Sequence, residues 1–426
     1  MMLNVCRFSA AVCVSAAWLA GACDRPAPAP PGRTTVDTVG TTVVVQNPDA
    51  PSPQPDSTAA PAASDTVWAR QIVRIGAVDG PPELTFGMIS SIATDRSGHL
   101  YVSDEIAGDV RVFSPRGEYR SRIGRGGDGP GEFRRPYGLA IGPAGELYVA
   151  DETRVQRFTA ARGAGTHQYE SSFPGPVYGF GLTTSRVDAS GRYHVQRSSG
   201  RIPEQRYFYI GYDRSGAPVD TLPLPRSLQM PVETAILRTG RSGGRMIPGL
   251  SLAPFTPVAS WALTPQGTLL VSSGTTYEIV EIDGSGDTLR VIRKKTAPRT
   301  VPRGEYQDSV RAVRARVAAA QAPLDRLEGV AEEIQTGRLR RTLPEVLAVH
   351  VATDGRIWVQ RWMREGKEGS AYDVFTREGT YLSTVLVPAR FSRAPSPVFT
   401  STRVYGVILD VETEVQQVGA FEVSLP

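Results

Sequence analysis

The stretch RIGRGGDGPGEF, residues 122–133, holds five glycines and shows how the chain is organised. Loops this rich in glycine either cradle a phosphate or join structural units. A phosphate loop needs a helix N-terminus, usually with a lysine beside it. No Gly-Lys-Ser/Thr follows here, and the residues after Pro136 alternate as strands do. An earlier stretch, RIGAVDGPPELTF at residues 74–86, has the same start, centre and end, which favours a joint between repeated units.

The repeated unit is a short strand, a turn that ends in glycine, and a second strand. Its five clear copies are IATDRSGHLYVSD (92–104), LAIGPAGELYVAD (139–151), SRVDASGRYHVQR (185–197), WALTPQGTLLVSS (261–273) and VHVATDGRIWVQR (349–361). The turn glycine is expected to supply a positive φ. A third alternating strand, a glycine turn and a fourth strand follow each copy. Four antiparallel strands per unit are typical of a propeller blade.

The two ends of the folded region complement each other. TRVYGVILDV with GAFEVSLP, near the C-terminus, forms a sixth unit that lacks its last strand, and TVWARQIVRIG (66–76) has the character of an isolated fourth strand. Pairing the two would close the ring and cover both sheet edges. We therefore predict an all-β fold over residues 66–426: a six-bladed β-propeller of four-stranded antiparallel blades, closed by strands from both chain ends.

Two insertions interrupt the repeat, at residues 223–253 between units three and four and at residues 298–343 between units four and five. In the second, apolar residues recur at helical spacing and predict an amphipathic helical hairpin that breaks near Pro323 and docks on the propeller: Val310, Val313, Val317, Leu324 and Leu327. Both insertions connect a fourth strand to the next first strand, so they share one rim. They form either a lid over a ligand or a stabilising decoration.

The segment GPGEFRRPYGLAIGPAGELYVADETRVQRF (129–158) resembles an NHL repeat. The whole set of repeats is similar to the six-bladed propellers of bacterial lipoproteins and sensor ectodomains, most closely in units one and two and more loosely from residue 181 onward. The resemblance implies the fold. It implies no single function, because such propellers include lyases, lactonases, sensors and binding platforms.

The N-terminus has the pattern of an export signal over residues 1–22: Arg7, a short apolar run over 8–22, and small residues before Cys23. LAGAC resembles a bacterial lipobox, although Ala20 stands where a larger aliphatic residue is preferred, and an ordinary signal peptidase would cut the same bond. We expect lipidation at Cys23 and a membrane-anchored protein of the cell envelope, periplasmic or at the cell surface. The alternative is a soluble secreted protein.

Residues 23–65 are rich in Pro, Ala, Ser and Thr and poor in aromatics, which predicts a disordered tether. All three cysteines lie within or beside the signal, so the folded region has no disulfide or thiolate metal site. The formal net charge is +4, but only three of the 47 basic residues are lysines. That skew is typical of a GC-rich genome, and with the export signal it argues against a nucleic-acid partner.

Metal chemistry is poorly supported by the sequence. The four histidines fall in different layers of different blades: His99, His167, His194 and His350. This argues against a zinc lyase related to the peptidyl-hydroxyglycine lyases. Lactonase-like propellers hold calcium with asparagine and acidic side chains, and residues 66–426 contain no asparagine. We predict no metal, no cofactor and no catalytic residue, and keep a metal-dependent hydrolase or lyase with an axial site as the alternative.

Candidate ligand contacts come from the first strands. One aligned column holds Ala93, Ala140 and Ala262, but carries Arg186 and His350 in units three and five. We expect these two to contact a ligand in the channel, or else to pair with neighbouring blades. A second candidate set is expected at the rim entrance: Arg135, Tyr137, Asp104 and Asp151. The two aspartates would alternatively cap backbone N–H groups. The favoured function is a monomeric, non-catalytic binding, scaffold or sensor module for a protein, peptide or glycan partner.

Overall fold

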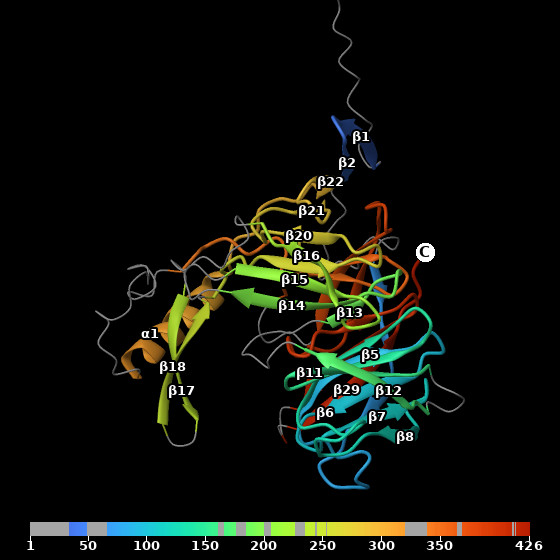
Figure 1. Cartoon of the computed structure of the whole chain (residues 1–426). Coiled ribbons are helices and arrows are strands. Elements are labelled where there is room, and N and C mark those ends of the chain that lie inside the picture. The colour runs from blue at the N-terminus through green and yellow to red at the C-terminus, as the bar shows by residue number, and fades with distance from the viewer. Residues whose placement is uncertain are drawn as a thin grey trace, which may run out of the picture.

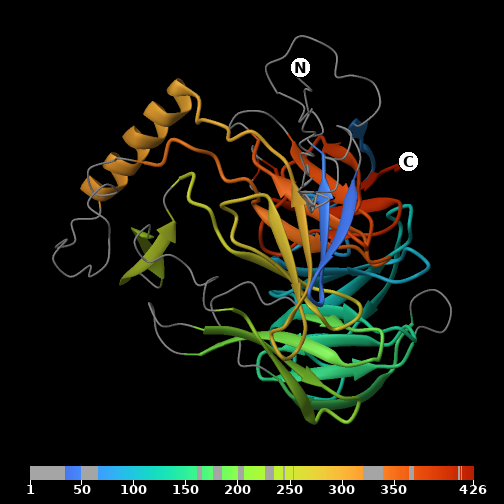
Figure 2. The ribbon, with the colours of Figure 1, turned by 90° about the horizontal axis from the view of Figure 1, so that it is seen from above.

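The computed structural model describes residues 34–48, 66–160, 166–175, 185–199, 206–225, 235–242, 245–252, 254–319, 339–363, 369–410, 413 and 415–426. The main body is a six-bladed β-propeller of four-stranded antiparallel blades, which confirms the predicted architecture (Figures 1 and 2). The predicted export signal and Cys23 lie outside the described residues.

Blades one to three follow the chain, and the first strand of each is innermost. Blade one consists of β5 (Ile89–Thr94), β6 (Leu100–Asp104), β7 (Asp109–Phe113) and β8 (Tyr119–Ile123). Blade two consists of β9 (Pro136–Ile141), β10 (Leu147–Asp151), β11 (Arg154–Phe158) and β12 (Tyr169–Pro174). Blade three consists of β13 (Ser185–Val187), β14 (Tyr193–Ser199), β15 (Arg206–Tyr212) and β16 (Pro218–Pro223).

Blades four to six repeat the pattern. Blade four consists of β19 (Ser260–Leu263), β20 (Leu269–Ser272), β21 (Glu278–Ile282) and β22 (Thr288–Lys294). Blade five consists of β23 (Ala348–Val351), β24 (Ile357–Arg361), β25 (Ser370–Phe375) and β26 (Tyr381–Val387). Blade six consists of β27 (Val398–Phe399), β28 (Arg403–Leu409), β29 (Gln416–Glu422) and, from the other end of the chain, β4 (Arg70–Ile75), which pairs antiparallel with β29.

The glycine-rich stretch is a joint, as its repetition indicates. It connects β8 of blade one to β9 of blade two, and its Phe133 is fully buried among apolar residues of both blades. Gly124 has a φ of +73°, and a Cβ there would lie 2.2 Å from the Phe133 ring. Glycine is therefore required at this position both by the backbone conformation and by the close approach of the ring.

Apolar side chains fill each interface between neighbouring blades. One cluster joins blades one and two, another joins two and three, and the series continues around the ring to blades five and six. A sixth cluster joins blade six to blade one, with Val407 and Val418 packed against Ile92 and Val102. Each blade therefore buries both of its faces against its neighbours.

Part of the segment predicted to be a tether is ordered. Residues 35–47 form a hairpin of β1 (Thr35–Val39) and β2 (Thr42–Asn47), and β2 pairs in parallel with β22 at the outer edge of blade four. β3 (Thr66–Trp68) pairs in parallel with β26 of blade five. The run Val43–Val45 is β-branched, and Val45 is buried, so this stretch gains from joining a sheet despite its Pro-, Ser- and Thr-rich surroundings.

Asn47 attaches this hairpin to two blades. Its Nδ2 donates to the carbonyl oxygens of Arg293, at 3.2 Å, and Gly379, at 2.9 Å. Its Oδ1 accepts from the backbone N–H of Tyr381 at 2.8 Å. Arg293 belongs to blade four and the other two residues to blade five. One buried amide therefore connects the N-terminal segment to both sheets.

The two insertions lie together to one side of the propeller (Figures 1 and 2). The first contains the hairpin of β17 (Ala235–Ser242) and β18 (Arg245–Leu252). The second contains α1 (Arg303–Ala319), the first half of the predicted helical hairpin; Leu324 and Leu327 lie outside the described residues. A small cluster joins the second insertion to the segment that follows the first: Phe255, Val301, Leu339 and Leu343, with Tyr306, Val310 and Trp362 against it.

Replacing Phe133, the aromatic residue in the glycine-rich joint, should destabilise the whole propeller. We expect Phe133→Ala to lower the free energy of unfolding by about 3–5 kcal/mol, because it leaves a cavity between blades one and two. Urea unfolding measures this. Ile106→Ala is the control, since Ile106 is 73% exposed and its loss should change stability by less than about 0.5 kcal/mol. Equal effects of the two substitutions would contradict the role assigned to Phe133.

Replacing Asn47 should release the hairpin and leave the blades intact. For Asn47→Ala we expect the amides of residues 42–47 to exchange with solvent roughly tenfold faster or more, because the three hydrogen bonds that join Asn47 to blades four and five are lost. Hydrogen exchange with mass spectrometry measures this. Val36→Ala, at an exposed position of the same hairpin, should leave exchange unchanged. Unaltered protection in Asn47→Ala would show that the strand pairing alone holds the hairpin.

Candidate functional site

A cavity of about 2680 Å³ runs along the propeller axis. Its wall includes residues from the innermost strands of all six blades, β5, β9, β13, β19, β23 and β27. The second insertion also contributes, through Gly304, Glu305, Asp308, Ser309 and Ala312, and so does the segment that follows the first insertion, through Pro254, Phe255 and Thr256. The cavity therefore extends from the propeller axis to the rim that carries the insertions.

The strand registers bear out the aligned column of first-strand residues. Ala93 lies opposite Tyr101, Ala140 opposite Tyr148, and Ala262 opposite Leu270. Arg186 lies opposite His194 and His350 opposite Trp358. All five column residues line the cavity, as does Phe399 of blade six. The small alanines leave room beside the two large polar side chains.

Arg186 bridges three blades. Its Nη1 donates to the carbonyl oxygen of Leu263 in blade four, at 2.8 Å, and its Nη2 donates to that of Ala352 in blade five, at 3.2 Å. Burial between the blades lowers the pKa of the guanidinium to about 10, which leaves it charged at neutral pH. Arg186 makes no ion pair with a carboxylate in the described part of the chain. Two backbone carbonyls hold this cation, and no acidic side chain among the described residues pairs with it.

His350 is a neutral imidazole packed among aromatic rings. Its ring centroid lies 4.9 Å from that of Phe399 and 6.2 Å from that of Tyr372. Burial lowers the pKa of His350 to about 4, because the charged form would lose its hydration. Its Nε2 is buried and has no hydrogen-bond partner among the described residues. A neutral imidazole of this kind can offer one hydrogen bond to a ligand.

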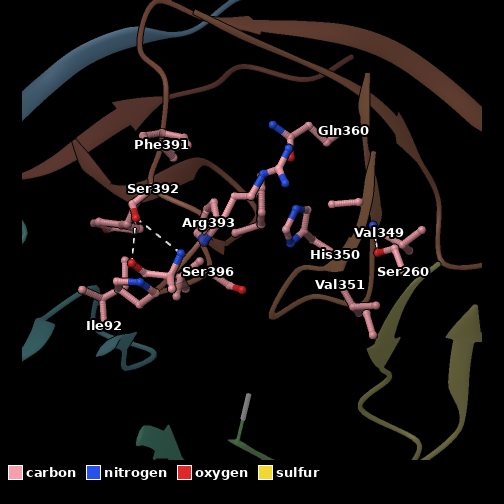
Figure 3. Close-up of a pocket in the computed structure, with 18 of the residues that line it drawn as sticks. Ile92, Ser260, Val349, His350, Val351, Gln360, Phe391, Ser392, Arg393 and Ser396 are labelled. Carbon is pink, nitrogen blue, oxygen red and sulfur yellow. Dashed lines mark hydrogen bonds between the residues drawn. The ribbon is translucent and has the colours of Figure 1, made fainter. Parts of the chain in front are cut away.

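Two further polar side chains approach His350 that the sequence did not single out. In Figure 3 the side chain of Arg393 points toward Gln360 and His350. Gln360 lies on β24, and Arg393 lies in the loop between β26 and β27. Gln360 aligns with Gln196 in the VQR motif of units three and five, which was an available signal. The position of Arg393 depends on how its loop folds, and no repeat marks it.

Asp104 forms part of the connection between β6 and β7. Its carboxylate accepts hydrogen bonds from the backbone N–H groups of Gly87, Met88, Ile106 and Ala107, at 2.8 to 3.2 Å. It also pairs with Arg111 at 3.2 Å and is fully buried. With this many donors around it, the carboxylate has little capacity left for a ligand.

The remaining rim candidates separate into two groups. Asp151 repeats the capping pattern of Asp104, accepting from the backbone N–H groups of Arg134, at 2.9 Å, and Arg135, at 2.8 Å. The Arg135 side chain pairs with Glu105. Tyr137 is buried and lines the cavity, whereas Arg135, Asp104 and Asp151 do not. Of the four residues expected at the rim entrance, the structure places Tyr137 alone in the cavity wall.

The comparisons with known proteins agree with the fold. A family model, DUF5128, described as a 6-bladed beta-propeller, matches residues 81–160. No curated protein matches the chain by sequence. The chain is similar to virginiamycin B lyase from Staphylococcus aureus, with 12% identity, a TM-score of 0.37, and coverage of 84% of this chain and 94% of that one.

The chain is also similar to two other solved structures. One is a member of the duf4221 family from Bacteroides vulgatus, with 10% identity, a TM-score of 0.41, and coverage of 85% of this chain and 100% of that one. The other is regucalcin, a calcium-binding protein from Agrobacterium tumefaciens, with 10% identity, a TM-score of 0.34, and coverage of 84% and 96%. At these identities the similarity concerns the fold alone.

The described residues lack both a metal-binding group and a membrane-spanning helix. They hold no group of three or more His, Cys, Asp or Glu side chains arranged to bind a metal ion. They also hold no helix with the length and apolar character needed to cross a membrane.

The histidine in the cavity should titrate far below its usual range. We expect nuclear magnetic resonance to give His350 a pKa of about 4, with the resonance assigned by its loss in His350→Phe. Since the unfolded chain takes up this proton near pH 6.5, the wild type should lose up to about 3 kcal/mol of stability relative to His350→Phe between pH 6.5 and 4. A His350 titration near 6.5 would contradict the enclosed environment.

Proposed function

We propose that this protein is an exported, NHL-like β-propeller, lipid-anchored through Cys23, that acts as a non-catalytic binding, scaffold or sensor module. The rim that carries the insertions takes a protein, peptide or glycan partner. The protein acts as a monomer in the cell envelope and uses no cofactor. The pairing of β4 with β29 closes the ring that presents this rim, and the helical insertion follows blade four.

One observation carries the proposal: residues of the second insertion line the axial cavity. Here α1 contributes Glu305 and Ser309 to the cavity wall, and Phe255, two residues after the end of the first insertion, lies beside them in the same wall. Phe255 has a φ of +63°, a left-handed conformation that is costly for a bulky side chain. Strained residues of this kind gather at ligand-binding sites.

The insertions are held in place at this rim. Tyr306 of α1 accepts a hydrogen bond at its hydroxyl from Leu339 N–H, at 3.3 Å, and donates one to the Leu339 carbonyl, at 3.2 Å. The guanidinium of Arg341 lies over the Tyr306 ring, 4.6 Å from its centroid. These contacts hold the start of α1 against the last residues of the same insertion, at the rim where a partner would meet it.

Site-specific photo-crosslinking tests the rim. We expect a photoreactive residue at Asp308 on α1 or at Ser396 in the cavity wall to capture one partner in envelope fractions. The same residue at Arg120, on the outermost strand of blade one, should capture none. Mass spectrometry then identifies the partner, and the purified pair gives a dissociation constant.

Excision of α1 supplies the complementary variant. Val301 N–H donates to the Arg341 carbonyl at 2.8 Å, so a short Gly-Ser turn can replace residues 303–339 with little strain. We expect this variant to keep the β-sheet circular dichroism and to bind the partner at least roughly tenfold more weakly. Unchanged affinity, or equal crosslinking from Arg120, would overturn the rim proposal.

A further inference from the structure

The charges around the axial cavity are not balanced. Three acidic side chains in its wall pair with arginine, Glu105 with Arg135, Asp308 with Arg311 and Asp354 with Arg356, and two more contact an imidazole, Asp95 that of His99 and Asp188 that of His194. Glu305 also has an interaction of its own. By contrast, Arg186 and Arg393 line the same cavity and form no ion pair in the described part of the chain. Three further arginines in the same wall, Arg96, Arg197 and Arg403, also form no ion pair with a described residue, so the cavity holds five such cations.

Arg186 is fixed in position. Its guanidinium contacts blades four and five through the carbonyl oxygens of Leu263 and Ala352. Burying a cation without a counter-ion is costly, and backbone dipoles offset only part of that cost. The Ala352 carbonyl that accepts from Arg186 is two residues from His350 on the same chain segment. An anion bound near His350 would also lower the cost of burying Arg186.

Arg393, Gln360 and His350 supply hydrogen-bond donors that suit a planar anion. The guanidinium of Arg393 and the amide of Gln360 both offer N–H donors, and the two side chains point toward each other (Figure 3). The buried Nε2 of His350 has no partner among the described residues. A guanidinium forms paired hydrogen bonds with a carboxylate, and the amide and imidazole can each add one. These three residues come from blade five and from the loop that leads to blade six.

The walls next to these donors are apolar. Ile92, Val349, Val351 and Phe391 lie around the group in Figure 3, and Phe399 packs against His350. A fully solvated ion such as inorganic phosphate would leave these surfaces wet. A ligand with an apolar body would cover them while its charged end meets the donors.

We propose that the axial cavity binds the carboxylate of a ligand with an apolar body, with Arg393, Gln360 and His350 holding the carboxylate and Arg186 providing a positive field beneath it. This inference rests on the proposed binding role and names the chemistry that the rim partner presents. The carboxylate could belong to a free aliphatic acid or to the C-terminus of an apolar peptide. Both sources present the same group to the same donors.

Isothermal titration calorimetry on the purified protein tests the inference with matched pairs of probes. Octanoate is compared with octanol, and N-acetyl-leucyl-leucine with its C-terminal amide. We expect each carboxylate to bind at least roughly tenfold more tightly than its neutral mate, as a charged hydrogen-bonded pair provides. Whichever carboxylate binds more tightly identifies the source.

Variants locate the site. We expect Arg393→Gln to reduce the preference for octanoate over octanol roughly tenfold or more, and Gln360→Leu and His350→Phe to reduce it severalfold. Arg377→Gln is the matched control, since Arg377 is exposed and pairs with its neighbour Glu378 outside the cavity wall. Arg186→Gln also removes contacts between blades, so its binding is compared only at temperatures where its circular dichroism is native.

Several outcomes would overturn the inference: equal binding of acids and neutral mates, no binding of either acid at millimolar concentration, or an unchanged preference in Arg393→Gln. Tighter binding of glucuronate or inorganic phosphate than of octanoate would overturn the requirement for an apolar body. These results are independent of the crosslinking experiment. Octanoate binding without a captured partner would refute the rim proposal alone, and capture without carboxylate preference would refute this inference alone.

Discussion

The structure depends on one constraint: a four-stranded blade has two faces, and neither can be left in water. The six apolar clusters meet this constraint by pairing every blade with both neighbours, including blade six with blade one through Val418 and Ile92. No blade has a core of its own, because each cluster draws on two sheets. The glycine-rich joint follows from the same requirement, since it must turn sharply and still insert Phe133 between two blades. The N-terminal segment adds strands at the outer edges of blades four, five and six without disturbing these interfaces.

The ring leaves a characteristic environment at its centre. The innermost strands lie close together and are joined by side chains, such as Ser91 accepting from Leu139 N–H at 3.0 Å and Ser260 accepting from Val349 N–H at 2.7 Å. Small or hydroxyl side chains are adequate for that task. Half-buried Arg186, and His350 with an Nε2 that has no partner among the described residues, are larger and more polar than this task requires, and they occur on the strands of blades three and five, on either side of the alanine of blade four. The equivalent positions of blades one, two and four hold alanine. This contrast is the reason for assigning the two large polar side chains to ligand binding.

The sequence was sufficient to predict the blades, but not the N-terminal hairpin or the irregular loops attached to them. A strand–glycine–strand repeat constrains both the hydrogen-bond partners and the side-chain alternation, so the turn glycines Gly98 and Gly355 could be assigned and have φ values of 79° and 88°. The hairpin at residues 35–47 was missed because overall composition outweighed a short β-branched run, and because the role of Asn47 depends on residues more than 240 positions away. In the site, the repeat alignment found Arg186 and His350. It could not find Arg393, whose position depends on an irregular loop, and it assigned Asp104 to a rim where its carboxylate instead holds the local backbone.

The pairing of β4 with β29 has a consequence for the order of events during biosynthesis. β4 is among the first strands to be made, and its partner is the last, more than 300 residues later in the chain. Blade six therefore cannot form until synthesis is nearly complete, and until then β4 and the open faces of blades one and five are exposed to other chains. A nascent chain that stalls or is truncated before residue 416 would lack the whole of β29, the partner on which β4 depends. The ring therefore closes as one unit, late in synthesis. Until then, chaperones that cover exposed apolar faces would be needed to keep the incomplete ring from aggregating.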